Sequence, residues 1–380
     1  MDFSWNAEQE RLRERAVEFA RNKLKADPIR DEWNESAFRK GWKACAEFGL
    51  QGLIAEDKFG GMGLDLLSGM LVMEGMGFGS HDNGLLFSIN AQTWSFLSPL
   101  LHFGTPEQQA RFVPALCRGE LIGAHAMSEP EAGSDAKAIR TTATRVAGGY
   151  VLNGSKTFVT NGPVADAFLV FARLTDGGSG KGITGFIVDR SAKGLKVGGP
   201  IKKMGMNTSA FCEVFLEQCE IPRSSLLGDE GNGFLMFSLA MVEERIFIMA
   251  AHVGAMERQL AEAHAYAKTR KQFDRQIKEF QAVSHMLVEM KIALETSKLL
   301  LYKAAWLKSS GQKAILESSI AKVHVTESWV KSNLLAMKIH GGYGYTAEFG
   351  IERQLRDSVG SLFYSGTSEI QRNIIAGLMD

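Results

Sequence analysis

The sequence HGGYGY at residues 340–345 and the sequence YSGTSEIQR at residues 364–372 enclose a short amphipathic segment near the C-terminus. The segment follows a long stretch whose apolar residues recur at helical spacing. Glycines at this density allow backbone N–H groups to approach a ligand closely. We therefore expect the C-terminal region to place a ligand-contacting turn on a helical scaffold.

The composition indicates an ordinary globular protein. The chain has 380 residues, of which 45% are hydrophobic and 23% are charged. Lys and Arg together number 43, as do Asp and Glu, so the composition supports neither a nucleic-acid partner nor an anionic membrane surface. A neutral chain of this size favours self-association. The charged N-terminus predicts no signal peptide and no apolar run is long enough to span a bilayer, so we expect a cytoplasmic protein without membrane insertion.

The cysteine content also favours a cytoplasmic protein. Cys45, Cys117, Cys212 and Cys219 form no CxxC pair. This spacing favours reduced, mostly buried thiols over disulfides or a metal site.

Hydrophobic periodicity divides the chain into three regions. Residues 1–120 are predicted to be helical, with Asn6 and Thr105 as N-caps. Residues 121–226 contain several short strands between glycine-rich turns, including a hairpin that turns at Gly148 and Gly149, which suggests a small β-barrel or sandwich. Residues 227–380 contain three long helices, at about 233–270, 279–310 and 313–341, with short connections, which predicts an antiparallel four-helix bundle. The predicted fold class is therefore α+β and multidomain.

Three further motifs carry chemistry that suits a nucleotide. MSEPEAGSD at residues 127–135 follows a short apolar strand, and TFVTNG occupies residues 157–162. Hydroxyls and glycine at a strand end suit a flat heterocycle, although each motif alone is also typical of a turn. YAKTRKQF at residues 266–273 ends a predicted helix with Arg270, whose planar fork suits a pyrophosphate. A solvated basic helix terminus is the alternative interpretation of that motif.

These five motifs, in this order from Ser128 to Arg372, resemble the acyl-CoA dehydrogenase family over essentially the whole chain. The resemblance implies an N-terminal helical domain, a central β-barrel and a C-terminal four-helix bundle. It implies FAD bound between barrel and bundle and completed by a second subunit, in a homo-oligomer that we expect to be a tetramer. It also implies oxidation of an acyl thioester between Cα and Cβ, with a flavoprotein or oxygen as electron acceptor.

The resemblance carries individual site residues onto this chain. The substrate contacts would be Ser134, Arg245 and Ser365. The FAD contacts would be Met127, Ser128, Gly133, Ser134, Phe158, Thr160, Arg270, Phe273, Gln281, Lys338, Gly341, Gly342, Thr367 and Glu369. Two of these positions depart from the common pattern: Phe158 replaces a frequent Trp and loses an N–H donor, and Lys338 replaces a frequent Gln.

The catalytic base is the main departure, because Ser365 stands where the family usually has a glutamate. Serine has no adjacent base here to activate it, although its backbone N–H could still polarise a thioester carbonyl. VEERIF at residues 242–247 places two carboxylates in an apolar helical run. An internal Glu–Arg ion pair is one interpretation. The isovaleryl-CoA and long-chain subfamilies carry their base in a similar Glu-Arg sequence, which assigns the role to Glu244. Glu243 points about 100° away around the helix, so it should pair elsewhere or face another surface.

The acyl group is less closely defined. Several C-terminal blocks, including residues 256–260, 281–285 and 349–358, resemble dehydrogenases that act on prolyl groups tethered to carrier proteins. Residues 202–206 resemble ordinary acyl-CoA dehydrogenases instead. The alternatives are an isovaleryl-like acyl-CoA dehydrogenase, a flavin oxidase of the same fold, and a flavin- or thioester-binding scaffold without chemistry.

Overall fold

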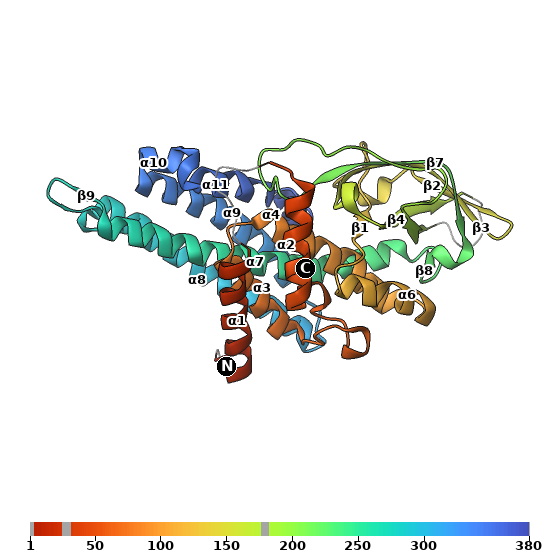
Figure 1. Cartoon of the computed structure of the whole chain (residues 1–380), viewed down its shortest axis with the longest axis horizontal. Coiled ribbons are helices and arrows are strands. Elements are labelled where there is room, and N and C mark those ends of the chain that lie inside the picture. Colours follow the sequence, from red (N-terminus) through yellow and green to blue (C-terminus); the bar gives the residue numbers. More distant parts are fainter. Residues whose placement is uncertain (1–3, 25–31, 176–181, 380) are drawn as a thin grey trace.

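The computed structural model describes residues 4–24, 32–175 and 182–379 (Figure 1). The β-strands gather toward one end of the molecule, and the hairpin of β9 (Lys271–Gln272) and β10 (Arg275–Gln276) projects at the opposite end. Helices fill the space between them. This order confirms the predicted α+β architecture with helical N-terminal and C-terminal regions around a β region.

The N-terminal region consists of helices. Asn6 and Thr105 both form capping boxes at the starts of their helices, as the sequence predicts. A five-residue π-helix, Thr93–Leu97, connects two of the helices. The helices are α1 (Ala7–Lys23), α2 (Glu35–Phe48), α3 (Leu66–Gly79), α4 (Asn83–Gln92), α5 (Ser98–Phe103) and α6 (Pro106–Cys117).

The strands of the central region join in one eight-stranded sheet with the order β6-β7-β3-β2-β4-β5-β8, and β1 pairs with β4 in parallel. The predicted hairpin is present, with Val146 opposite Gly149. The strands are β1 (Gly123–Ala126), β2 (Thr142–Val146), β3 (Gly149–Thr160), β4 (Ala167–Leu174), β5 (Ile183–Asp189), β6 (Leu195–Val197), β7 (Phe211–Pro222) and β8 (Leu226–Leu227).

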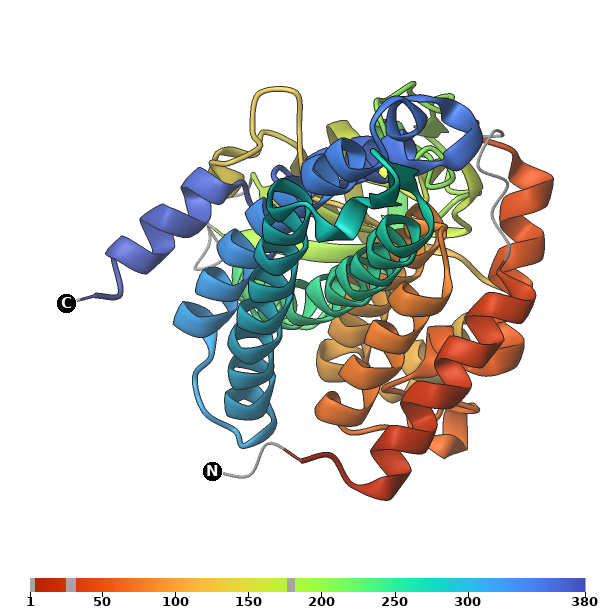
Figure 2. The same ribbon diagram turned by 90° about the vertical axis from the view of Figure 1, so that its left-hand side faces the viewer.

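The C-terminal region is dominated by three long helices that lie side by side (Figure 2). They match the three predicted from periodicity. Shorter helices follow them and pack against α9. The helices are α7 (Gly233–Thr269), α8 (Gln281–Ser309), α9 (Ile315–His340), α10 (Gly342–Tyr345), α11 (Ile351–Gly360) and α12 (Ser368–Ala376).

Two further predictions concern the state of the cysteines and the presence of membrane-spanning helices. Cys45, Cys117, Cys212 and Cys219 are all buried free thiols, as predicted. Among the described residues, no helix is both long and apolar enough to cross a membrane.

Helix α7 is seated tightly against α3 through two glycines. A Cβ added at Gly254 would overlap the backbone carbonyl of Glu74, and one added at Gly77 would overlap the backbone carbonyl of Ala251. Interiors this closely packed cannot absorb an extra methyl group without backbone movement. The contact therefore fixes the position of α7 relative to the N-terminal helices.

Replacing Gly254 with alanine should lower the free energy of unfolding by about 1–3 kcal/mol, because the added methyl group would push α7 away from α3. The measurement is the urea denaturation midpoint at a fixed FAD concentration. The matched control is Gly199→Ala, since a Cβ at Gly199 meets no atom within 4 Å. Equal midpoints for the two variants would contradict a tight α3–α7 contact.

Candidate functional site

Glu244 lies in the middle of α7 and is buried, with 7% of its surface exposed. Glu243 and Arg245 flank it in the sequence, whereas the residues one helical turn away on its own face, Ala240 and Ile248, are apolar and buried. Its carboxylate is therefore removed from water. A buried carboxylate is uncommon unless it is paired or functional. The environment of Glu244 therefore decides between these two interpretations.

Each carboxylate oxygen of Glu244 accepts a hydrogen bond from a serine. Ser365 donates from its Oγ to Oε1 at 2.5 Å, and Ser95 donates from its Oγ to Oε2. Ser365 comes from the loop between α11 and α12, and Ser95 comes from the π-helix Thr93–Leu97. Two segments distant in sequence thus meet at one side chain of α7.

This environment shifts the acidity of Glu244. Burial raises its pKa above the ordinary value, while the hydrogen bonds from Ser365 and Ser95 and the charge of Arg245 partly offset that effect. A carboxylate with a raised pKa is a stronger base once it is ionised. The site therefore suits Glu244 to proton abstraction.

The neighbouring charged residues have different partners. Glu243 accepts a hydrogen bond from Ser98 Oγ at 2.7 Å and lies 3.1 Å from the Lys308 ammonium, so it pairs elsewhere as predicted. Arg245 donates from Nε to the backbone carbonyl of Ser365 at 3.2 Å. Burial lowers the pKa of Arg245 to about 10. Among the described residues, the ion pair in this segment is Glu243–Lys308, and Glu244 has no ion-pair partner within 4.0 Å.

The Ser365 backbone is held in an unusual conformation. Its φ is 54°, and that of Gly366 is 87°. Its carbonyl accepts hydrogen bonds from Arg245 and from Gln371 Nε2, the latter at 3.1 Å. Its N–H has no hydrogen-bond partner within residues 4–24, 32–175 and 182–379. Positive φ in a residue other than glycine is typical of functional turns, and an unpaired N–H is available to a ligand carbonyl.

The structure also brings together the motifs at residues 127–135 and 157–162. Thr157 donates its N–H to the Ser128 carbonyl at 2.9 Å. Lys156 is fully buried, and its ammonium lies 2.7 Å from the Glu129 carboxylate and 3.2 Å from the Met127 carbonyl. Glu129 also accepts the N–H of Thr141 at 3.0 Å. This internal ion pair anchors the loop against β3, and the sequence analysis did not identify it.

Several residues predicted to bind FAD have surfaces that fit a large planar ligand. Phe158 has a positive φ of 54° and is 62% exposed, which is unusual for an aromatic side chain at a strand. Gly133 has no atom within 4 Å of the position of a Cβ. Ser134 is exposed beside it, and Thr160 is half-buried. An exposed aromatic face next to open glycine and hydroxyl groups suits a flavin.

A second group of predicted contacts lies at the far end of the helices, near the β9–β10 hairpin (Figure 1). The Arg270 guanidinium lies 5.8 Å from the centre of the Tyr343 ring, so the YAKTRKQF and HGGYGY motifs meet. Phe273 is 88% exposed, and a Cβ at Gly341 or Gly342 would meet open space. Gln281 and Lys338 are also exposed.

The remaining C-terminal residues have structural partners. The Thr367 hydroxyl caps α12 by accepting the Ile370 N–H at 3.3 Å, and Glu369 is exposed in the first turn of that helix. His340 bonds the Ala336 carbonyl and stacks on Tyr266 at 4.2 Å. These contacts give His340 a packing role within the fold.

A small hollow lies one helical turn beyond Glu244. Ile248 and His252 continue the face of α7 that carries Glu244. The His252 imidazole bonds the Tyr364 hydroxyl at 2.5 Å, and the Tyr364 ring lies 4.5 Å from the Phe87 ring. The hollow is lined by Asn83, Leu86, Phe87, Asn90, Ile248, Ala251 and His252.

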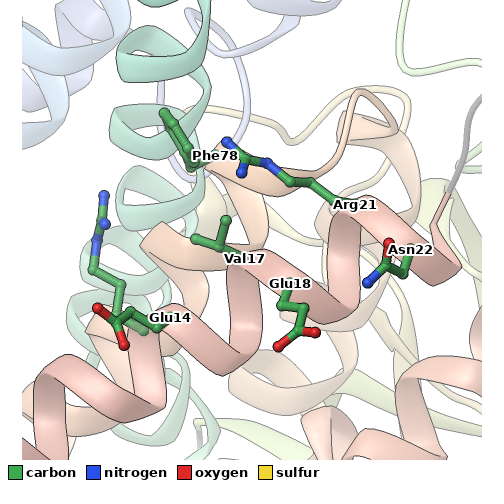
Figure 3. Close-up of a pocket in the computed structure, with 7 residues that line it drawn as sticks. Glu14, Val17, Glu18, Arg21, Asn22 and Phe78 are labelled. Carbon is green, nitrogen blue, oxygen red and sulfur yellow. The ribbon is translucent and has the colours of Figure 1, made fainter.

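A larger hollow of about 330 Å³ lies on the surface of α1 and contains none of the predicted site residues (Figure 3). Arg21 lies over the Phe78 ring in it, at 5.0 Å. Arg13 at its edge is already bound to Glu74 and Glu257. The remaining lining residues are Glu14, Val17, Glu18 and Asn22. Its lining combines the bound Arg13 with exposed side chains of α1, and none of the sequence motifs reaches it, so we do not assign it a ligand.

The chain is similar to known proteins over 99% of its length. The acyl-CoA dehydrogenase N-terminal, middle and C-terminal domain models match residues 6–120, 124–219 and 231–379. The L-prolyl-[peptidyl-carrier protein] dehydrogenase of Pseudomonas fluorescens is 37% identical over 99% of both chains. The crystal structure of the prolyl acyl carrier protein oxidase AnaB is 44% identical, with a TM-score of 0.94 over 99% of this chain and 100% of that chain. The structure of PigA with FAD and proline is 34% identical, with a TM-score of 0.94 over 99% and 98% of the two chains.

Proposed function

This chain belongs to the acyl-CoA dehydrogenase family, and on this premise we propose that it oxidises a prolyl-like aminoacyl group held as a thioester on a carrier protein. It is an FAD-dependent enzyme that acts on acyl thioesters. The observation that carries the proposal is the buried Glu244 carboxylate, held between Ser95 and Ser365 beside the Ser365 N–H, which has no hydrogen-bond partner among the described residues.

The chemistry assigned to this chain is proton abstraction. Glu244 takes the proton from the α-carbon while the Ser365 N–H hydrogen-bonds the thioester carbonyl, where negative charge develops. Bound FAD would supply the two-electron oxidant, as the acceptor of the hydride that leaves the β-carbon. Arg245 contributes by holding the Ser365 carbonyl, which orients that peptide group.

The cofactor would be held by two groups of residues. Met127, Ser128, Gly133, Ser134, Phe158 and Thr160 would contact the flavin end, with Thr367 and Glu369 beside it. Arg270, Phe273, Gln281, Lys338, Gly341 and Gly342 would contact the FAD of a second subunit. The exposure of Phe273 and the open surface at Gly341 support this division.

A prolyl-like group is favoured by the prolyl-carrier-protein names of two similar proteins. Beyond Glu244 along α7, His252 is hydrogen-bonded to the Tyr364 hydroxyl, and the ring of Phe87 packs against Tyr364. These side chains fill the space there, and a short acyl group suits such a closed end better than an extended chain.

The decisive experiment mixes the FAD-loaded protein anaerobically with L-prolyl carrier protein, with free L-proline and with branched and straight-chain acyl-CoAs. We expect prolyl carrier protein to bleach the flavin absorbance fastest and free proline to have no effect. Faster bleaching by an acyl-CoA would replace the proposed substrate with an isovaleryl-like one. Admission of air then tests the acceptor, because rapid reoxidation with peroxide formation would assign an oxidase.

The proposal extends to the oligomeric state, the cellular location and the electron acceptor. We propose a cytoplasmic homotetramer that passes its electrons to a soluble flavoprotein, with oxygen as the alternative acceptor. We also propose domain boundaries after residues 120 and 226, which lie between α6 and β1 and between the two residues of β8. Light scattering of the FAD-loaded protein would distinguish the tetramer from a dimer.

A further inference from the structure

We infer that Ser95 and Ser365 are positioning residues that together hold Glu244 in its reactive orientation, one serine for each carboxylate oxygen. This inference deepens the proposed function and rests on the assignment of Glu244 as the base. It gives the Ser365 side chain a role in place of the glutamate that usually occupies its position. It also adds Ser95, which neither the motifs nor the resemblance identified.

The geometry leaves the Glu244 carboxylate little freedom. The two serines approach from different segments, 149 and 121 residues away in sequence from Glu244. Each hydroxyl has one proton, and the carboxylate can only accept, so both protons are committed to Glu244 while it is ionised. Rotation of the carboxylate would break both hydrogen bonds together.

Ser95 is delivered by the π-helix Thr93–Leu97, whose wider turn is closed by a hydrogen bond from the Ser98 N–H to the Thr93 carbonyl. A π-turn contains one residue more than an α-turn, and such turns are frequent at functional sites. Without the extra residue, the side chains after it would be rotated by about 100° around the axis. The turn therefore sets which side chain faces α7.

His125 on β1 fixes the same turn from its other side. Its Nδ1 lies 3.1 Å from the Ser95 carbonyl oxygen. Because a carbonyl only accepts, this hydrogen bond requires the proton on Nδ1. Burial lowers the pKa of His125 to about 4, so the imidazole is neutral near pH 7. The backbone of Ser95 is thus held by β1 while its hydroxyl reaches Glu244.

Ser365 is fixed by comparable means. Its carbonyl is bound by Arg245 and Gln371, and its φ of 54° turns the side chain toward α7. A glutamate here would place a second carboxylate beside Glu244, and like charges at that distance would raise the pKa of one of them strongly. A serine instead donates a proton to the ionised base.

The other groups near Glu244 do not replace these donors. Burial lowers the pKa of His252 to about 3 and raises that of Tyr364, so both are neutral at pH 7 and are bonded to each other. The positive groups are Arg245 on α7 and Lys322 on α9, whose pKa burial lowers to about 8. Within the described residues, Glu244 accepts side-chain hydrogen bonds from the two serines alone.

These hydrogen bonds determine the direction in which the pKa of Glu244 should change when a serine hydroxyl is removed. Hydrogen bonds to the ionised carboxylate lower its pKa, so removal of a donor raises that pKa further. Ser95→Ala and Ser365→Ala should each move the acidic limb of the pH profile of kcat/KM upward by about one pH unit, and the double variant should move it further. Lys322 would affect the alkaline limb, so it does not interfere with the measurement.

The experiment includes a matched control on the adjacent carboxylate. Ser98→Ala removes the analogous hydrogen bond to Glu243 and should leave the acidic limb in place. Ser95→Thr retains a hydroxyl, so its acidic limb should lie close to that of the unmodified protein. If Ser95→Ala disrupts folding of the π-turn, the threonine variant still tests the role of the hydroxyl. A second readout follows the infrared band of the protonated Glu244 carboxyl against pH, identified by its absence in Glu244→Gln. Its midpoint should rise in both alanine variants without any turnover.

The outcomes separate this inference from the proposed function. Full activity of Glu244→Gln would overturn the assignment of the base itself. An inactive Glu244→Gln variant combined with unchanged pH profiles and infrared midpoints in Ser95→Ala and Ser365→Ala would overturn the positioning role alone. A shift in Ser98→Ala equal to that in Ser95→Ala would also overturn it, since the effect would then be general to the helix.

Discussion

Replacing Glu244 with glutamine should slow flavin reduction by a thioester by about 10²- to 10⁴-fold, the range associated with loss of a general base. The amide has a similar shape: its oxygen can accept the hydroxyl of one serine, and its NH2 group can donate to the hydroxyl oxygen of the other, so the helix should keep its place. Bound FAD should be retained, because no predicted flavin contact is altered. The measurement is anaerobic stopped-flow bleaching of the flavin absorbance with the preferred thioester.

Glu243→Gln is the matched control for this experiment. Glu243 is the adjacent residue on α7, is equally buried and carries the same charge, but it binds Ser98 and Lys308. Its substitution should leave the bleaching rate within a few-fold of that of the unmodified protein. If the two variants lost activity in reverse order, Glu243 would be the base and the orientation argued for α7 would be wrong.

Replacing Lys156 with methionine should lower the free energy of unfolding by about 3 kcal/mol, the lower end of the range for breaking a buried ion pair. The cost arises because Glu129, which is 7% exposed, would keep its charge without its cation. The hydrogen bond from the Thr141 N–H would remain and keep the cost at the lower end. FAD should also dissociate more readily, since the pair anchors the loop of residues 127–135. The measurements are the denaturation midpoint and the FAD content after gel filtration.

The double variant Glu129→Gln with Lys156→Met tests the cause. A neutral amide leaves no buried charge unpaired, but its oxygen can accept only one of the two backbone N–H groups that Glu129 binds, those of Arg140 and Thr141. Part of the lost stability should therefore return. If the double variant were as unstable as Lys156→Met, the loss would come from packing rather than from an unpaired charge. Unchanged stability and FAD content in Lys156→Met would show that the pair does not support the loop.

Local sequence patterns account for most of the predicted architecture. The ends of α7, α8 and α9 agree with the periodicity to within two residues, because the spacing of apolar side chains and the flanking turns act over a few residues. The burial of Glu244 could be predicted for a related reason. A carboxylate inside an apolar helical run is conspicuous in the sequence itself.

The sequence by itself determined the three-region fold and the buried carboxylate on α7, and it supplied the motifs that are predicted to hold FAD. Only the tertiary structure decided which side chains meet that carboxylate and which residue anchors the loop after β1. Ser95 sits in an apolar stretch with no motif of its own, and Lys156 resembles any strand lysine. Their roles depend on contacts between segments far apart in the chain, and such contacts arise from the packing of whole elements rather than from neighbouring residues.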